Sequence, residues 1–173
     1  FFSGGLSFLA EGKDDSLELN EVLKCAGELQ KNVKFIFLSS LDSAFSRTTD
    51  RSIRESAKEK LCEFYAAETG MEIKIVQIPW LYSGSYKEDF LYQIFEKSYH
   101  KEPIWLEVAP KQEIQFISMP DLTQLLMRLV DNWKNGSGVL AVVDEFHIPF
   151  ANLAEEITKV CGVQIALDTE KKV

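Results

Sequence analysis

Two apolar segments separated by a long amphipathic stretch constrain the fold of this chain most. The first segment, 34–38, reads Lys-Phe-Ile-Phe-Leu and ends in Ser39 and Ser40, and the second, 72–78, alternates apolar and polar residues. Between them, apolar residues recur at helical spacing up to Gly70, a residue type that commonly ends a helix. Two strands joined by a helix pair in parallel, and the continuous apolar run predicts a strand that is covered on both faces.

Strands and helices are predicted to alternate along the rest of the chain as well. Before the first segment we expect a strand at 6–10 and a helix from about Ser16; inside the amphipathic stretch, a helix carries Ile53, Ala57, Leu61, Phe64 and Tyr65 on its apolar face. After residue 78 we expect a loop at 79–86, a helix around 90–95, strands at 104–108 and 113–117, a helix from Pro120, a strand at 138–143, and a helix from Pro149 to Gly162. This order predicts an α/β fold with a largely parallel sheet.

Composition narrows the class of protein. A chain of 173 residues that is 46% hydrophobic, without a low-complexity linker or internal boundary, predicts one domain over 1–173. With 27 acidic and 19 basic residues, we expect neither a nucleic-acid nor an anionic membrane partner. Three cysteines without metal-ligand spacing favour a reduced protein that binds no metal, and no apolar run reaches the roughly 20 residues of a membrane span. We therefore expect a cytoplasmic protein.

Five groups of residues follow one another in the order of a known family. They are Leu6 to Ala10 with Asn20 in the next helix, Phe35 to Ser40, Glu68-Thr69-Gly70 with the strand to Ile78 and the loop Pro79 to Ser83, Gln115 to Leu122, and Pro149 to Gly162. With these groups, nearly the whole chain resembles the extended short-chain dehydrogenase/reductase family of NAD-dependent epimerases and dehydratases. The resemblance implies a Rossmann-like fold, a largely parallel sheet with flanking helices.

The resemblance begins only at about the family's fourth strand. That family binds the pyrophosphate of NAD(P) on a glycine-rich turn at a helix amino terminus, and no G-x-G-x-x-G occurs here, since Gly4 and Gly5 precede a strand instead of following one. The fold is therefore expected to be incomplete relative to the family, as a fragment of a longer protein or a truncated form. We expect no cofactor in this chain alone; NAD or NADP would require the missing amino-terminal half.

The resemblance also points to positions for the family's catalytic hydroxyl and for a nearby arginine. After Ser39 and Ser40, the hydroxyl position falls on Leu41, although Ser43 could reach it after a small shift. The arginine that often precedes the family's proline loop is Gln77 here.

The family's tyrosine and lysine are also replaced. Counting back from Gly70, the position of the tyrosine, the general acid and base, falls on Arg51, and the position of the lysine that lowers its pKa falls on Glu55. A shifted register gives Arg54 and Lys58, which restores a lysine but no tyrosine. We therefore predict no catalytic and no cofactor-binding residue in this chain.

A small-molecule ligand could still bind at the carboxyl ends of the strands, where open α/β sheets hold their ligands. The candidate residues of this cleft are Ser39, Ser40, Ser43, Pro79, Trp80 and Tyr82. The alternative is that the aromatic residues pack in the core.

Two hypotheses on association and function follow. The strand at Leu6 to Ala10 would form an exposed apolar edge, so we expect a second copy, an amino-terminal segment or a partner strand to cover it. In the family, helices at the positions of Ser16 to Gln30 and Arg51 to Thr69 form dimers, which favours a homodimer. The sequence indicates a non-catalytic binding, regulatory or oligomerisation domain; the alternative is an NAD(P)-dependent epimerase, dehydratase or reductase represented by an incomplete or divergent chain.

Overall fold

The computed structural model describes residues 16–28, 33–41, 44, 50–83, 90–102, 104–106, 111–134, 136–143 and 147–167. The strand expected at Leu6 to Ala10 and the candidate residue Ser43 lie outside these residues, so the covered edge and the role of Ser43 stay predictions.

The chain divides into two compact units. Unit 1 comprises Phe1–Pro79 and Pro120–Val143, and unit 2 comprises Trp80–Met119 and Asp144–Val173. Our expectation of a single domain over 1–173 contained no such division, because neither boundary is marked by a composition shift or a linker. A single domain over 1–173 stays a prediction.

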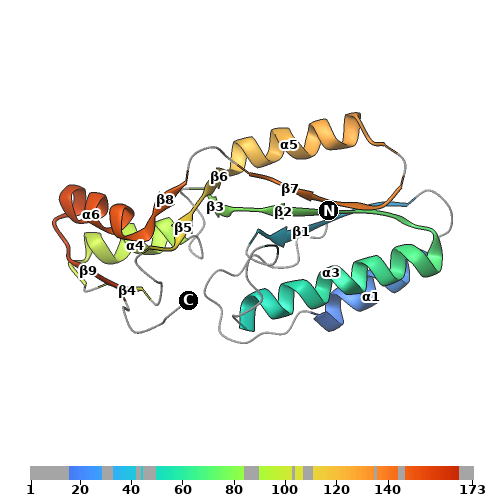
Figure 1. Ribbon diagram of the computed structural model, residues 1–173, viewed down its shortest axis with the longest axis horizontal. Helices are drawn as coiled ribbons and strands as arrows, with labels where there is room; N and C mark the ends of the chain where they lie inside the picture. Colours follow the sequence, from blue (N-terminus) through green and yellow to red (C-terminus); the bar gives the residue numbers. More distant parts are fainter. Residues whose placement is uncertain are drawn as a thin grey trace. The chain divides into compact units, whose positions relative to one another are not determined.

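Unit 1 is built on a three-stranded parallel sheet (Figure 1). Its strands, in spatial order, are β1 (Lys34–Ser40), β2 (Glu72–Ile78) and β7 (Gly138–Ala141). The register of the first pair runs from Lys34 opposite Glu72 to Ser40 opposite Ile78. This sheet confirms the predicted α/β class and the parallel pairing of the two apolar segments.

Helices lie on both faces of that sheet, α1 (Ser16–Glu28) and α3 (Asp50–Thr69) on one face and α5 (Met119–Asp131) on the other (Figure 1). The core between the sheet and the first two helices consists of Leu19, Leu23, Phe35, Phe37, Cys62, Met71, Ile73 and Ile75. Burying each large apolar side chain among these contributes roughly 1.5–3 kcal/mol. Because α3 connects two parallel strands, it runs antiparallel to them, and its first turns lie at their carboxyl ends.

The helix α3 buries a different face from the one that its apolar residues predicted. Ile53 and Phe64 are 52% and 57% exposed, so the prediction that they share the core face is wrong. Leu61 and Tyr65 do pack against the core, but the fully covered face also carries Glu59 and other polar residues. Hydrophobic periodicity missed this face because Glu59 on it is satisfied by donors from the strands β1 and β2.

Unit 2 has a core of its own, formed by Ile94, Ile104, Ile114, Phe150, Ile157 and Val163. Its helices are α4 (Phe90–Tyr99) and α6 (Phe150–Cys161). Three pairs of short strands accompany them: β3 (Trp80–Tyr82) with β6 (Phe116–Ser118) and β4 (Ile104–Leu106) with β9 (Ile165–Leu167) in parallel, and β5 (Glu113–Ile114) with β8 (Ile148–Pro149) antiparallel.

Unit 2 contains the main departures from the predicted elements. The expected loop at 79–86 includes strand β3, and the expected strand at 113–117 is two strands with different partners. The break falls at Gln115, whose carbonyl accepts a hydrogen bond from the Trp80 N–H at 3.1 Å. Strands this short are defined by their partners, which local sequence does not specify. The predicted stop of the last helix is confirmed, since Gly162 adopts the left-handed conformation at φ 66°.

Candidate functional site

A buried polar network lies near the carboxyl end of the sheet in unit 1. The Ser39 hydroxyl donates to Glu59 Oε1 at 2.6 Å, and the Gln77 side-chain amide donates to the same oxygen at 3.0 Å. All three side chains are buried. Sequence reasoning missed Glu59, because a glutamate on an amphipathic helix is ordinarily exposed and nothing in its neighbourhood marks it.

The strand register explains why these three residues meet. Ser39 of β1 pairs directly with Gln77 of β2, so both side chains emerge on the same face of the sheet. The helix α3 crosses that face and supplies Glu59. A buried carboxylate is costly unless donors surround it, and hydrogen bonds to a charged group contribute about 1.5–3 kcal/mol each. The network therefore fixes α3 on the two strands.

The hydroxyl position that follows β1 is filled by an apolar residue. Leu41 is 7% exposed, and its backbone N–H donates to the carbonyl of Ile78 at 2.8 Å. Ser40, immediately before it, is also buried. At Leu41 the chain can therefore offer a substrate no side-chain donor or acceptor.

The positions assigned to the tyrosine and the lysine lie on α3, about two turns and one turn before Glu59, respectively. Glu55, at the lysine position, forms an ion pair with Lys58, whose Nζ donates a hydrogen bond to Glu55 Oε1 at 3.0 Å. Lys58 is itself buried, whereas Arg54, the other residue of the shifted register, is exposed. The tyrosine of this helix, Tyr65, donates its hydroxyl to Asn20 Oδ1 of α1 at 2.9 Å and so serves helix packing. Neither register supplies a phenol.

The residues of the expected ligand cleft are divided between the units. Pro79 is buried at the end of its stretch of unit 1, and Trp80 begins unit 2. The Trp80 ring packs edge-on against Phe150, 6.0 Å between centroids, as part of the core of unit 2. Tyr82 is 39% exposed and packs edge-on against Phe116 at 6.3 Å. The aromatic residues thus have packing partners, and a ligand cleft at these residues stays a prediction.

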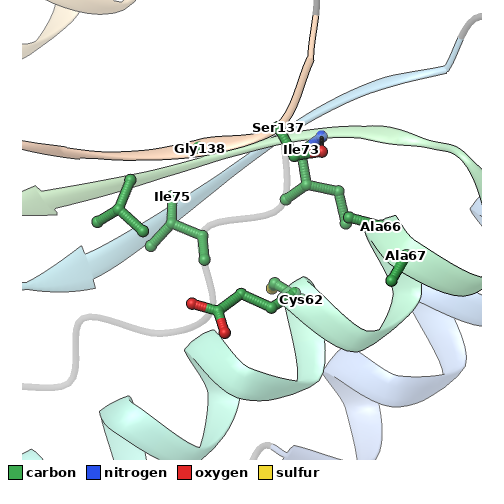
Figure 2. Close-up of a pocket in the computed structure, with 9 residues that line it drawn as sticks. Cys62, Ala66, Ala67, Ile73, Ile75, Ser137 and Gly138 are labelled. Atoms are coloured by element: carbon green, nitrogen blue, oxygen red, sulfur yellow. Dashed lines mark hydrogen bonds between the residues drawn. The ribbon is translucent and has the colours of Figure 1, made fainter.

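Unit 1 also contains a cavity that the sequence did not predict (Figure 2). It has a volume of about 390 Å³ and lies between α3 and the strands β2 and β7. Its lining is Cys62, Glu63, Ala66, Ala67, Ile73, Ile75, Ser137, Gly138 and Val139. The size falls within the range of small-ligand pockets, roughly 300–1,000 Å³. The cavity escaped prediction because its walls come from three separate segments of the chain.

The thiol of Cys62 in this cavity is unreactive by position. Burial raises its pKa to about 12, with further contributions from the carboxylates of Glu59 and Glu63. A thiol nucleophile needs a lowered pKa, so Cys62 is a packing residue. The Ser137 hydroxyl is held by two backbone groups. It accepts a hydrogen bond from the Ile73 N–H of β2 at 3.0 Å and donates one to the carbonyl of Met71, just before β2, at 3.2 Å.

Metal-binding groups and membrane-spanning helices are both absent from the described parts of the chain. No group of His, Cys, Asp and Glu there could hold a metal ion. Within the same residues, no helix combines the length and the apolar character that spanning a bilayer requires. The exposed His147 lies 3.6 Å from the carboxylate of Glu113.

The parallel sheet, the strand–helix–strand crossover and the helices on both faces define a Rossmann-like α/β protein. No family model matches the sequence, and no curated protein matches it either. Solved structures do match, and they have the fold of NAD-dependent sugar-nucleotide epimerases. The predicted resemblance to the epimerase and dehydratase family is thus confirmed as a resemblance of fold.

Three of these structures illustrate the match. UDP-glucuronic acid 4-epimerase from Bacillus cereus, in complex with UDP-glucuronic acid and NAD, superposes with a TM-score of 0.71 at 14% identity over 94% of this chain and 57% of its own. MoeE5 in complex with UDP-glucose and NAD superposes with a TM-score of 0.72 at 15% identity, over 88% of this chain and 56% of its own. A GalE-like L-threonine dehydrogenase from Cupriavidus necator, in its holo form, superposes with a TM-score of 0.64 at 22% identity, over 90% of this chain and 57% of its own. The chain therefore spans little more than half the length of the structures it resembles.

The described residues do not fit the reactive end of a nicotinamide cofactor. The resemblance would place a hydroxyl, a phenol and an ammonium group around it, but the positions it assigns hold Leu41, Arg51 and Glu55, and of these Leu41 is buried. Glu55 is moreover held in its pair with Lys58.

Proposed function

We propose that the chain is a non-catalytic, epimerase-like module, a pseudoenzyme scaffold that works by association. The observation that carries the proposal is the pair of Glu55 and Lys58 on α3. In place of a tyrosine activated by a lysine, the helix presents a carboxylate already neutralised by its neighbour. General acid–base catalysis needs a group that can exchange a proton with substrate at the operating pH.

The buried network supports the same proposal. Ser39 and Gln77 direct their side chains to Glu59, so the polar residues at this end of β1 and β2 hold the helix in place. The architecture is therefore stabilised without the residues that would perform the reaction. Such an arrangement suits a scaffold whose outer surfaces carry the function.

We further propose a homodimer through α1 and α3. The outer face of α3 carries Ile53 and Phe64, 52% and 57% exposed, and α1 exposes Leu17 at 75%. Large apolar side chains grouped on a helix pair indicate an interaction surface, and a two-fold axis would bury the same residues of both copies.

Cofactor binding and dimerisation are tested separately. For the first, we expect titration with NADH or NADPH, followed by nucleotide fluorescence, to show no binding up to millimolar concentration. For the second, light scattering should give the mass of a dimer, and Phe64→Glu should give a monomer. Phe95→Glu is the matched control, since Phe95 is 49% exposed on α4 of unit 2 and should leave the mass unchanged. A monomeric parent chain at micromolar concentration would refute the dimer.

A second candidate is an NAD(P)-dependent enzyme of which this chain is one part. It is favoured by the structural relatives, which were solved with NAD, and by the chain's span of little more than half their length. Micromolar binding of NADH, or turnover of a UDP-sugar by a longer form of the protein, would establish it. Lack of turnover in a form that does bind NAD(P) would instead support the non-catalytic module.

A further inference from the structure

The strand β7 is an open edge of the sheet in unit 1. It pairs with β2 on one side, and on its other side no strand lies among the described residues. All of its residues are exposed, including Val139 at 47% and Leu140 at 42%. An exposed apolar edge strand is a template for pairing with another chain.

The direction of the backbone groups on β7 follows from one hydrogen bond. Val142, directly after the strand, donates its N–H to the Gln77 carbonyl of β2 at 2.8 Å. Because successive residues of a strand point their backbone groups to opposite sides, the N–H groups of Val139 and Ala141 point toward the open edge. An additional strand would find these two donors in line.

The cavity lies beside this edge, on the face of the sheet that α3 covers (Figure 2). Ile75 of β2 and Val139 of β7 are direct partners in the register, and both line the cavity. On the helix side it is bounded by Ala66 and Ala67. Alanines opposite the strand edge leave room for a large apolar side chain from an added strand, whose alternate residues would point into this space.

The charge at the cavity selects the partner. Glu63 is the charged residue of the lining, and its side chain is 45% exposed. Its carboxylate forms a surface ion pair with Lys60, with 2.6 Å between Oε2 and Nζ. Surface pairs of this kind contribute little and exchange readily. A second carboxylate, that of Glu59, lies near enough to Cys62 to contribute with Glu63, after burial, to the raised pKa of its thiol. With a net charge of −8, the whole chain also attracts basic partners.

We propose that β7 binds an extended segment of a partner polypeptide as an added strand, with an apolar side chain in the cavity and a lysine or arginine beside Glu63. Main-chain hydrogen bonds would supply affinity, and the cavity and the carboxylate would supply specificity. A second copy of this chain fits less well, because it would bring another Glu63 toward the first. The proposal goes beyond the scaffold function and does not depend on the dimer through α1 and α3.

A fluorescein-labelled peptide, Thr-Lys-Val-Leu-Val-Lys-Thr, provides the probe. As a strand, it presents a leucine between two lysines on one face and two valines on the other. Binding is measured by fluorescence anisotropy at 50 mM and 300 mM salt, and we expect saturable binding that weakens at the higher salt. The same peptide with both lysines replaced by glutamate should bind at least about tenfold more weakly.

Variants of the protein separate the parts of the site. Ala67→Trp fills the cavity and Ala141→Pro removes an outward N–H, and each should weaken binding about tenfold. Glu63→Gln should weaken it about fivefold, whereas Glu68→Gln, at an exposed position of the same helix, should not. Circular dichroism confirms that each variant is folded, and Phe64→Gln, which removes the exposed apolar side chain of the proposed dimer without changing the charge, should bind the peptide as the parent does.

The outcomes distinguish the alternatives. No saturable binding of the labelled peptide, or equal binding of the glutamate peptide, would overturn the proposal. Binding that survives Ala141→Pro but is lost with Ala67→Trp would overturn the added strand in favour of a ligand held by the cavity alone. Loss with both variants, together with the effect of Glu63→Gln, supports it.

Discussion

Replacing Glu59 by alanine should destabilise the protein strongly, although the residue belongs to no catalytic set. The substitution removes the oxygen that accepts hydrogen bonds from Ser39 at 2.6 Å and Gln77 at 3.0 Å. Both donors are buried, 0% and 6% exposed, so water cannot readily replace the lost acceptor.

The magnitude follows from those two donors. A buried polar group left without its partner costs about 1–3 kcal/mol, so the two together cost roughly 2–6 kcal/mol. Removing a buried charge returns part of its desolvation cost, which reduces the expected loss to about 2–4 kcal/mol. That is a large share of the about 5–15 kcal/mol that stabilises a typical domain. Glu59→Gln keeps an acceptor oxygen but loses the charge, and should cost about 1 kcal/mol.

Urea unfolding followed by circular dichroism measures these losses. Glu68→Ala makes the same chemical change at an exposed position of the same helix, and should stay within about 0.5 kcal/mol of the parent. Ser39→Ala should cost about 1–2 kcal/mol, and the double variant with Glu59→Ala should lose less than the sum, because both changes remove one shared bond. If Glu59→Ala is no less stable than Glu68→Ala, the network does not hold α3 to the sheet and the reasoning fails.

Three further predictions concern packing in unit 1. The Cys62 thiol, with its pKa raised to about 12 from an ordinary 9.0, should not react with Ellman's reagent at pH 8 in the folded protein, whereas exposed Cys25 should. Between pH 9 and 12 the Cys62 thiol loses its proton in the unfolded chain but keeps it in the folded protein, so the free energy of unfolding should fall across that window. The fall should be smaller in Cys62→Ala. Equal pH profiles of the unfolding free energy for the parent and Cys62→Ala would contradict this prediction. A Cβ at Gly27 would lie 3.0 Å from Thr69 Cγ2. Gly27→Val should therefore lower the free energy of unfolding, measured by urea titration, by about 1–3 kcal/mol. A variant as stable as the parent would show that α1 and α3 can move apart freely.

The sequence alone predicted the described strands and helices of unit 1. Periodicity located the helix that ends before Gly70 and the strand at 72–78, because a parallel unit requires contiguous apolar segments of this length. The lack of a phenol at Arg51 could also be read from the order of residues, since a missing residue type needs no coordinates. The strands of unit 2 were less predictable, since each is only two or three residues long and depends on a distant partner.

Only the tertiary structure revealed the network at Glu59 and the cavity beside β7. Glu59 is buried because Ser39 and Gln77, 20 and 18 residues away in the chain, supply donors at the same point in space. The cavity is formed where α3, β2 and the start of β7 meet, and these are three segments far apart in the chain. Local sequence patterns indicate which residues are usually exposed to water. They do not indicate which distant residues supply the hydrogen bonds that allow a polar residue to be buried.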